Sequence, residues 1–83
     1  MAKANIGNHI RRLRFNQDEM TQQELAERAG CTRQTIILLE QGRYAPSLAL
    51  AFRIARTFGL GVDDVFEYLS NGETEGRNRG KPR

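Results

Sequence analysis

One short segment, residues 33–41, carries side chains that can make directed contacts to the edges of nucleic-acid bases. With 3.6 residues per helical turn, four of these side chains fall within an arc of about 100°. They are Gln34, Ile37, Leu38 and Gln41. The Gln34 amide can donate to and accept from adenine, and an apolar tip can pack on the methyl group of thymine. Arg33 can reach a guanine edge or a phosphate. Simple core packing of Ile37 and Leu38 remains an open alternative.

The other residues that could do chemistry form no catalytic set. His9 is the only histidine and has no cysteine or second histidine at ligand spacing, which argues against a metal site. Asp63 and Asp64 are adjacent and would not face each other on a helix, so they better suit the positive end of a helix dipole. Cys31 could be a redox switch, but a small half-buried turn residue is the simpler interpretation. The sequence therefore predicts no enzyme, no cofactor and no small-molecule ligand.

Five helical segments are expected around these residues, which predicts an all-α, five-helix domain. Hydrophobic spacing and capping signals place the helices at residues 5–16, 22–29, 33–41, 48–58 and 62–69. Thr21, three residues before Glu24, has the form of a capping box. Thr32 and Ser47 are suitable N-caps, and a glycine follows each of the three middle helices.

The turn between the second and third predicted helices indicates what the domain binds. It has three residues, 30–32, and two short helices joined in this way cross at a steep angle. The helix at Arg33–Gln41 can then stand out from the domain and enter a major groove. The sequence therefore predicts a helix-turn-helix that binds double-stranded DNA in a sequence-specific manner.

Length and charge fit one small basic domain. The 83 residues carry 13 Lys and Arg against 10 Asp and Glu, a net charge of +3. Residues 5–69 hold all the apolar periodicity, whereas residues 70–83 are rich in Gly, Asn and charged side chains and predict a disordered basic tail. No apolar run approaches the ~20 residues of a membrane span, and a single cysteine suits a reducing cytoplasm, so a cytoplasmic protein is expected.

Residues 10–69 resemble the Cro and lambda-repressor-like (XRE) class of helix-turn-helix transcriptional regulators. The matching positions are spread over nearly the whole predicted domain, and as a set they are specific. They are Ile10–Phe15, Glu19–Ala26, Gly30, Thr32–Ile37, Leu39–Glu40, Gly42–Tyr44, Pro46–Leu48, Ala51–Ala55, Phe58–Gly59 and Val65–Phe66.

The resemblance implies a DNA-binding role at eight positions. The base-reading positions are occupied by Arg33, Gln34, Ile37 and Leu38. The positions that face the phosphate backbone are occupied by Gln22, Thr32, Arg43 and Tyr44. The resemblance also implies a structural ion pair between Arg14 and Glu40, away from the DNA contacts.

Three positions depart from the pattern of the class. Asp18 stands where a glycine is common, and Asp tolerates left-handed geometry. Gly61 stands where a Ser or Thr cap is usual, so the fifth helix is expected to start less firmly. Leu38 replaces a small residue, which favours a site that contains thymine.

Exposed apolar residues near the C-terminal end predict self-association. One short recognition helix reads few bases, and such proteins usually bind two half-sites as dimers. Phe52, Tyr68 and Leu69 are the candidate homodimer interface, whereas Phe66 is expected in the core. The predicted function is a dimeric regulator of transcription, most simply a repressor. The alternatives are an antitoxin that represses its own operon and a helical adaptor that binds protein.

Overall fold

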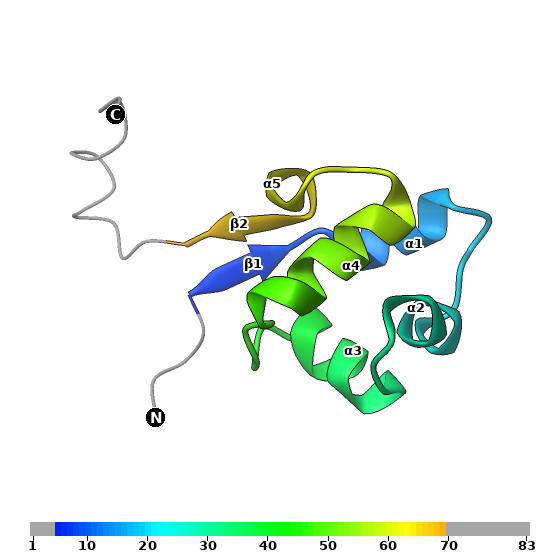
Figure 1. Ribbon diagram of the computed structural model, residues 1–83, viewed down its shortest axis with the longest axis horizontal. Coiled ribbons are helices and arrows are strands. Elements are labelled where there is room, and N and C mark those ends of the chain that lie inside the picture. The colour runs from blue at the N-terminus through cyan, green and yellow to red at the C-terminus, as the bar shows by residue number, and fades with distance from the viewer. Residues whose placement is uncertain (1–4, 70–83) are drawn as a thin grey trace.

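The computed structural model describes residues 5–69 and contains five helices and a two-stranded sheet (Figure 1). In chain order the elements are β1 (Ile6–Asn8), α1 (Ile10–Asn16), α2 (Gln22–Ala29), α3 (Arg33–Glu40), α4 (Leu48–Phe58), α5 (Val62–Val65) and β2 (Phe66–Tyr68). The five-helix fold is therefore confirmed. The basic tail expected at residues 70–83 lies outside the described residues.

The two ends of the domain differ from the prediction, because they form strands instead of extending the first and last helices. β1 and β2 pair antiparallel, with Ile6 opposite Tyr68 and Asn8 opposite Phe66. The first helix was predicted to begin at residue 5 and the last helix to end at residue 69, and both predictions were wrong over the residues that form these strands. Each segment is only three residues long, so its local preference is weak, and pairing satisfies the backbone groups of both. His9 lies half-buried just before α1.

One hydrophobic core holds the helices together. Its side chains come from every helix. The core consists of Ile10, Met20, Leu25, Ala26, Ala29, Ile36, Leu39, Leu50, Ala51, Ile54, Ala55, Phe58, Val65 and Phe66. The longest helix, α4, lies against α2 and α5 and supplies five of these residues. The burial of Phe66, the first residue of β2, confirms its predicted place in the core.

The predicted caps fix where the middle helices begin. The Glu24 N–H donates to Oγ1 of Thr21 at 3.0 Å, and the Thr21 N–H donates to Oε1 of Glu24 at 2.9 Å, which completes the capping box. Oγ1 of Thr32 accepts from the Thr35 N–H, which caps α3. A Ser47 cap does the same for α4.

The turn between α1 and α2 contains two consecutive left-handed residues. Asp18 has a φ of 57°, as its position predicted, and Glu19 follows with a φ of 55°. A non-glycine residue in this region costs about 1–2 kcal/mol, and glutamate has no short side chain to offset that cost. Glu19 is therefore a site of backbone strain.

Candidate nucleic-acid interface

The joint between α2 and α3 has the geometry of a helix-turn-helix. Gly30 ends α2 in the left-handed region, with a φ of 76°, and Thr32 starts α3 two residues later. The Arg53 Nε, on α4, donates to the Ala29 carbonyl at 2.6 Å and so satisfies one of the open carbonyls at the end of α2. The turn is thus stabilised by the Thr32 cap of α3 and by the Arg53 side chain of α4.

The helix α3 has one face anchored in the core and another face open to solvent. Ile36 is 0% exposed and Leu39 is 2% exposed, whereas Arg33 and Gln34 are exposed. Ile37 and Leu38 are half-buried and belong to no buried cluster. The first turn of α3 is consequently a polar, accessible end on a rigidly seated helix.

An ion pair between α1 and α3 fixes the orientation of α3, as the resemblance to XRE regulators implied. The Nε and Nη2 of Arg14 donate to the two carboxylate oxygens of Glu40 at 2.7 and 3.1 Å. The Nη1 of Arg14 also donates to the Met20 carbonyl at 2.8 Å. Because the two side chains are only 15% and 10% exposed, the pair lies mostly out of water. It is a structural contact and leaves neither charge free.

Gln22, at the start of α2, joins the same group of side chains. Its Nε2 donates to Oε1 of Glu40 at 3.2 Å. An amide nitrogen carries two protons, so one N–H of Gln22 stays available to an outside acceptor. The position implied as a phosphate contact therefore also has a structural role.

Asn8 is a positioning residue that the sequence reasoning missed. Its Nδ2 donates to the Leu39 carbonyl at 2.8 Å, and its Oδ1 accepts from the Ile10 N–H at 3.0 Å. One side chain thus connects β1, the start of α1 and the end of α3. The missed signal was an asparagine just before an apolar helix start, which is a common capping pattern.

The loop after α3 presents a cation and an aromatic ring. Gly42 has a φ of 74°, and the Arg43 N–H donates to the Leu38 carbonyl at 3.0 Å, so the loop turns sharply at the end of the helix. The side chains of Arg43 and Tyr44 are exposed. Within residues 5–69 the Arg14–Glu40 pair is the only salt bridge, so Arg33 and Arg43 have no carboxylate at ion-pair distance there.

The chain matches a family model described as helix-turn-helix over residues 10–65. This segment begins with α1 and ends with α5, and it includes the whole joint between α2 and α3. The chain belongs to the helix-turn-helix family.

Several helix-turn-helix relatives are similar over most of this domain. An uncharacterized HTH-type transcriptional regulator of Methanothermobacter thermautotrophicus is 65% identical over 48 residues, which are 57% of this chain and 70% of that protein. One from Methanocaldococcus jannaschii is 53% identical over 49 residues, 59% of this chain and 74% of that protein. One from Archaeoglobus fulgidus is 53% identical over 55 residues, 66% of this chain and 73% of that protein. These likenesses support a small regulator of the XRE class.

The implied DNA-binding positions are spread over three parts of the domain. Gln22 starts α2, Ile37 and Leu38 are half-buried on α3, and Arg43 and Tyr44 lie in the loop after α3. Thr32, Arg33 and Gln34 are exposed on the first turn of α3 and just before it. The candidate interface residues Phe52, Tyr68 and Leu69 lie on α4, on β2 and just after β2, with exposed fractions of 52%, 72% and 45%.

Within residues 5–69 no three His, Cys, Asp or Glu side chains lie close enough together to hold a metal ion. In the same part of the chain, every helix is too short or too polar to cross a membrane. Burial raises the pKa of the Cys31 thiol, and the nearby Arg53 cation opposes this shift in part.

Proposed function

We propose that this chain is a DNA-binding transcriptional regulator that reads a specific sequence with α3. The observation that carries the proposal is the exposed first turn of α3 on a helix whose other face is anchored by Ile36 and Leu39. An anchored helix can present polar side chains to a major groove without losing its own position. The assignment to the helix-turn-helix family supports binding to double-stranded DNA.

Direct base contacts fall to the exposed side chains of α3. Gln34 is the best candidate, because its amide matches the donor and acceptor pair of adenine. Arg33 fits a guanine edge or a nearby phosphate, and the half-buried Ile37 and Leu38 still offer apolar surface to a thymine methyl group. The preferred half-site should therefore contain A·T pairs.

Contacts to the phosphate backbone fall to residues on either side of α3 in the sequence. Gln22 offers its remaining N–H, and Thr32 lies at the N-terminus of α3, where the helix dipole favours an anion. Arg43 and Tyr44 offer a guanidinium and a hydroxyl from the loop after α3. Such contacts fix the register of a protein on DNA and carry no sequence information themselves.

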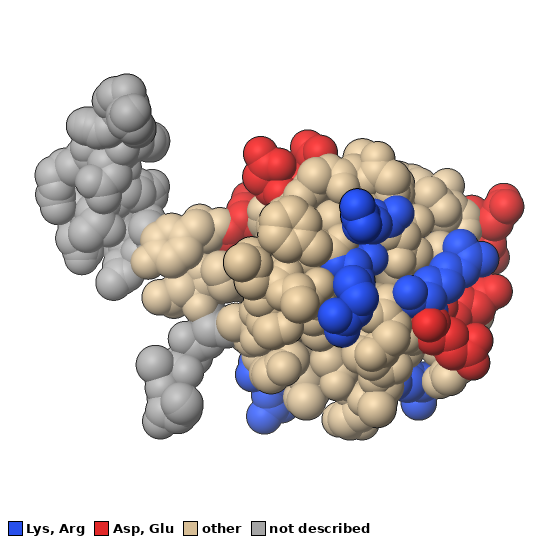
Figure 2. Space-filling model, in the orientation of Figure 1, with Lys and Arg blue, Asp and Glu red and all other residues tan. Residues whose placement is uncertain are grey.

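We further propose that the active form is a homodimer that represses transcription in the cytoplasm. At 1.5 Å per residue, the eight residues of α3 are about 12 Å long, so one copy reads only a few base pairs. Tyr68, Leu69 and Phe52 offer exposed apolar surface for a second copy. In the view of Figure 2, the surface between the sheet and α4 is largely uncharged, which suits contact between like-charged copies. A dimer bound to DNA can repress transcription most simply by excluding polymerase.

The test is selection of binding sites from a random duplex library, followed by comparison of two variants. An enriched inverted repeat, with half-sites about one helical turn apart, is expected from a dimer. Gln34→Ala should relax base preference at one position of each half-site, whereas Arg43→Ala should weaken binding to all sequences alike. The reverse pattern would show that these two roles are assigned wrongly. Salt-insensitive protein binding without DNA enrichment would favour the adaptor instead.

Self-association needs its own measurement. Sedimentation of Tyr68→Ser should show a monomer at concentrations where the wild-type chain is a dimer, because the variant loses the exposed aromatic ring of the candidate interface at β2. Leu48→Ser is a suitable control, since Leu48 is equally exposed at 72% and lies outside the candidate interface. A wild-type monomer on its selected duplex would contradict the dimer.

A further inference from the structure

A hollow between α1, α2 and α3 lies beside the candidate base-reading turn. The hollow is lined by Arg33 of α3, by Gln22 of α2 with its N-cap Thr21, and by Arg11 of α1. Arg14 and Glu40 also line it. The resemblance to XRE regulators implied no role for Arg11.

The charges in this hollow leave two cations without a partner. Arg14 and Glu40 neutralise each other through two hydrogen bonds. Arg11 and Arg33 are exposed, and neither has a carboxylate within ion-pair distance among residues 5–69. Glu19, also on the lining, is the remaining acidic group. Two free guanidinium groups against one exposed carboxylate leave the hollow positive.

The start of α2 adds uncharged donors to the same place. The capping box uses the N–H groups of Thr21 and Glu24 and leaves that of Gln22, which lines the hollow, without an intrahelical partner. The second N–H of the Gln22 side chain is also available. A backbone donor, an amide and two guanidinium groups around one hollow match the oxygens of a phosphodiester.

We propose that this hollow holds a phosphate of the DNA backbone and that Arg11 is a further DNA contact, made from α1. The inference rests on the proposed function and deepens it. With Arg11 on one wall and Arg33 on another, the phosphate beside the first turn of α3 is held from two helices. This second contact fixes how deeply α3 enters the groove, because α1 is joined to α3 through the Arg14–Glu40 pair.

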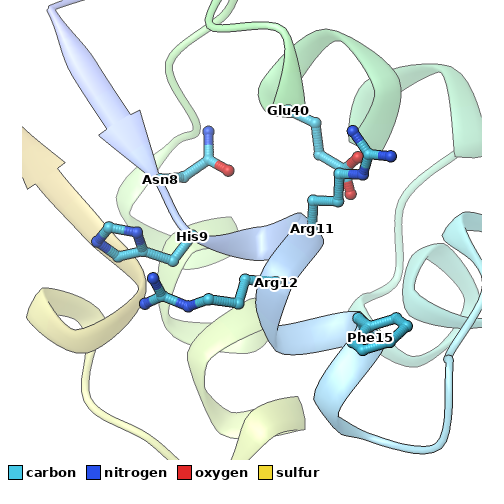
Figure 3. A pocket seen from close by; sticks show the side chains of 6 residues that line it. All are labelled: Asn8, His9, Arg11, Arg12, Phe15 and Glu40. Atoms are coloured by element: carbon cyan, nitrogen blue, oxygen red, sulfur yellow. The ribbon is translucent and has the colours of Figure 1, made fainter.

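Arg12 provides a matched comparison within the same helix. Both Arg11 and Arg12 are exposed, and both line a second hollow with His9 and Phe15. Figure 3 shows that Arg11 extends toward the side of Glu40, whereas Arg12 extends toward His9. Only Arg11 also lines the hollow with Gln22 and Arg33.

The experiment compares Arg11→Gln with Arg12→Gln in the full chain, because both variants lose the same charge. Affinity for the selected duplex is measured between 50 and 200 mM salt. Loss of one phosphate contact lowers the salt slope by about 0.9, so the affinity of Arg11→Gln should fall about 3.5-fold less than that of the wild type over this range. Arg12→Gln should keep the wild-type slope, and Arg11→Lys should keep most of it. Base preference should be unchanged in all three.

The outcomes separate this inference from the proposed function. Equal slopes for Arg11→Gln and Arg12→Gln, both below that of the wild type, would overturn the contact and leave only general charge attraction. An unchanged slope for Arg11→Gln would overturn it as well. A wild-type chain that binds no duplex would overturn the proposed function first. Far-ultraviolet circular dichroism of each variant confirms folding, which is expected because both arginines are exposed.

Discussion

Removal of one partner of the Arg14–Glu40 pair should destabilise the domain far more than removal of both. In Glu40→Leu, Arg14 loses two of its three hydrogen bonds and keeps only the one to the Met20 carbonyl. The charge of Arg14 then remains unpaired on a side chain that is only 15% exposed. In Arg14→Met, the Glu40 carboxylate keeps only the Gln22 amide as a partner.

The size of the effect follows from the number of bonds and the burial. Loss of one partner of a fully buried pair costs about 3–5 kcal/mol. Since some water reaches both side chains, we expect about 2–3 kcal/mol for each single variant. A domain of this size has about 3–10 kcal/mol in total and loses about 4–8 °C of Tm per kcal/mol, so Tm should fall by about 10–20 °C. The double variant leaves no unpaired charge and should lose less than either single variant.

Urea unfolding of the wild type, the two single variants and the double variant measures this coupling directly. We expect a coupling free energy of at least about 2 kcal/mol in favour of the pair, because the penalty of an unpaired charge appears in each single variant only. The reasoning is refuted if the double variant loses the sum of the two single losses within about 0.5 kcal/mol. That result would mean that water solvates each charge adequately when its partner is gone.

Three further variants or reactions test other features. Glu19→Gly should raise the free energy of unfolding, measured in urea, by about 0.5–1 kcal/mol, because glycine relieves the left-handed strain. The control Gln17→Gly, at a φ of −106°, should lower the free energy of unfolding. A change of the same sign in both variants would contradict the strain at Glu19. Native Cys31 should react with iodoacetamide more slowly than Cys31 of the urea-unfolded chain near pH 8.5, because burial raises the pKa of its thiol. The same raised pKa means that the free energy of unfolding decreases as pH rises above about 8.5. Equal reaction rates in the native and unfolded chains would argue against a raised pKa. Asn8→Ala should cost about 1–2 kcal/mol in thermal unfolding, with loss of the bond to Leu39, whereas an unchanged Tm would show that water replaces both contacts.

Local signals in the sequence predicted most of the helical fold. Thr21 and Glu24 are three residues apart, so their capping box can be recognised without any knowledge of the rest of the chain. The left-handed Gly30 and the inward Ile36 are likewise fixed by neighbours within one helical turn. The position of Gln34 on an open helix face followed from the same periodicity.

Contacts between distant segments could not be predicted in this way. Ile6 and Tyr68 pair across 62 positions of sequence, and three residues on each side give too short an alternation to identify a strand. The bond from Asn8 to Leu39 depends on that pairing, and the hollow around Arg11 depends on how three helices pack. The Arg14–Glu40 pair was anticipated only through the resemblance to a family.

The antiparallel pairing of β1 and β2 also determines how the domain would respond to a pulling force. The Leu69 N–H donates to the Asn5 carbonyl at 2.7 Å, so the first and last described residues are neighbours. A pull that separates these two ends loads one pair of backbone bonds at a time, from Ile6 and Tyr68 inward to Asn8 and Phe66, and therefore unzips the sheet at low force. The unzipping reaches Asn8 last. The next load is shared by the bond from Asn8 to the Leu39 carbonyl, at the end of α3, and the bond from the His9 N–H to the Val65 carbonyl. Tension between the two ends is thereby transmitted to the helix proposed to read DNA before any helix has to unfold.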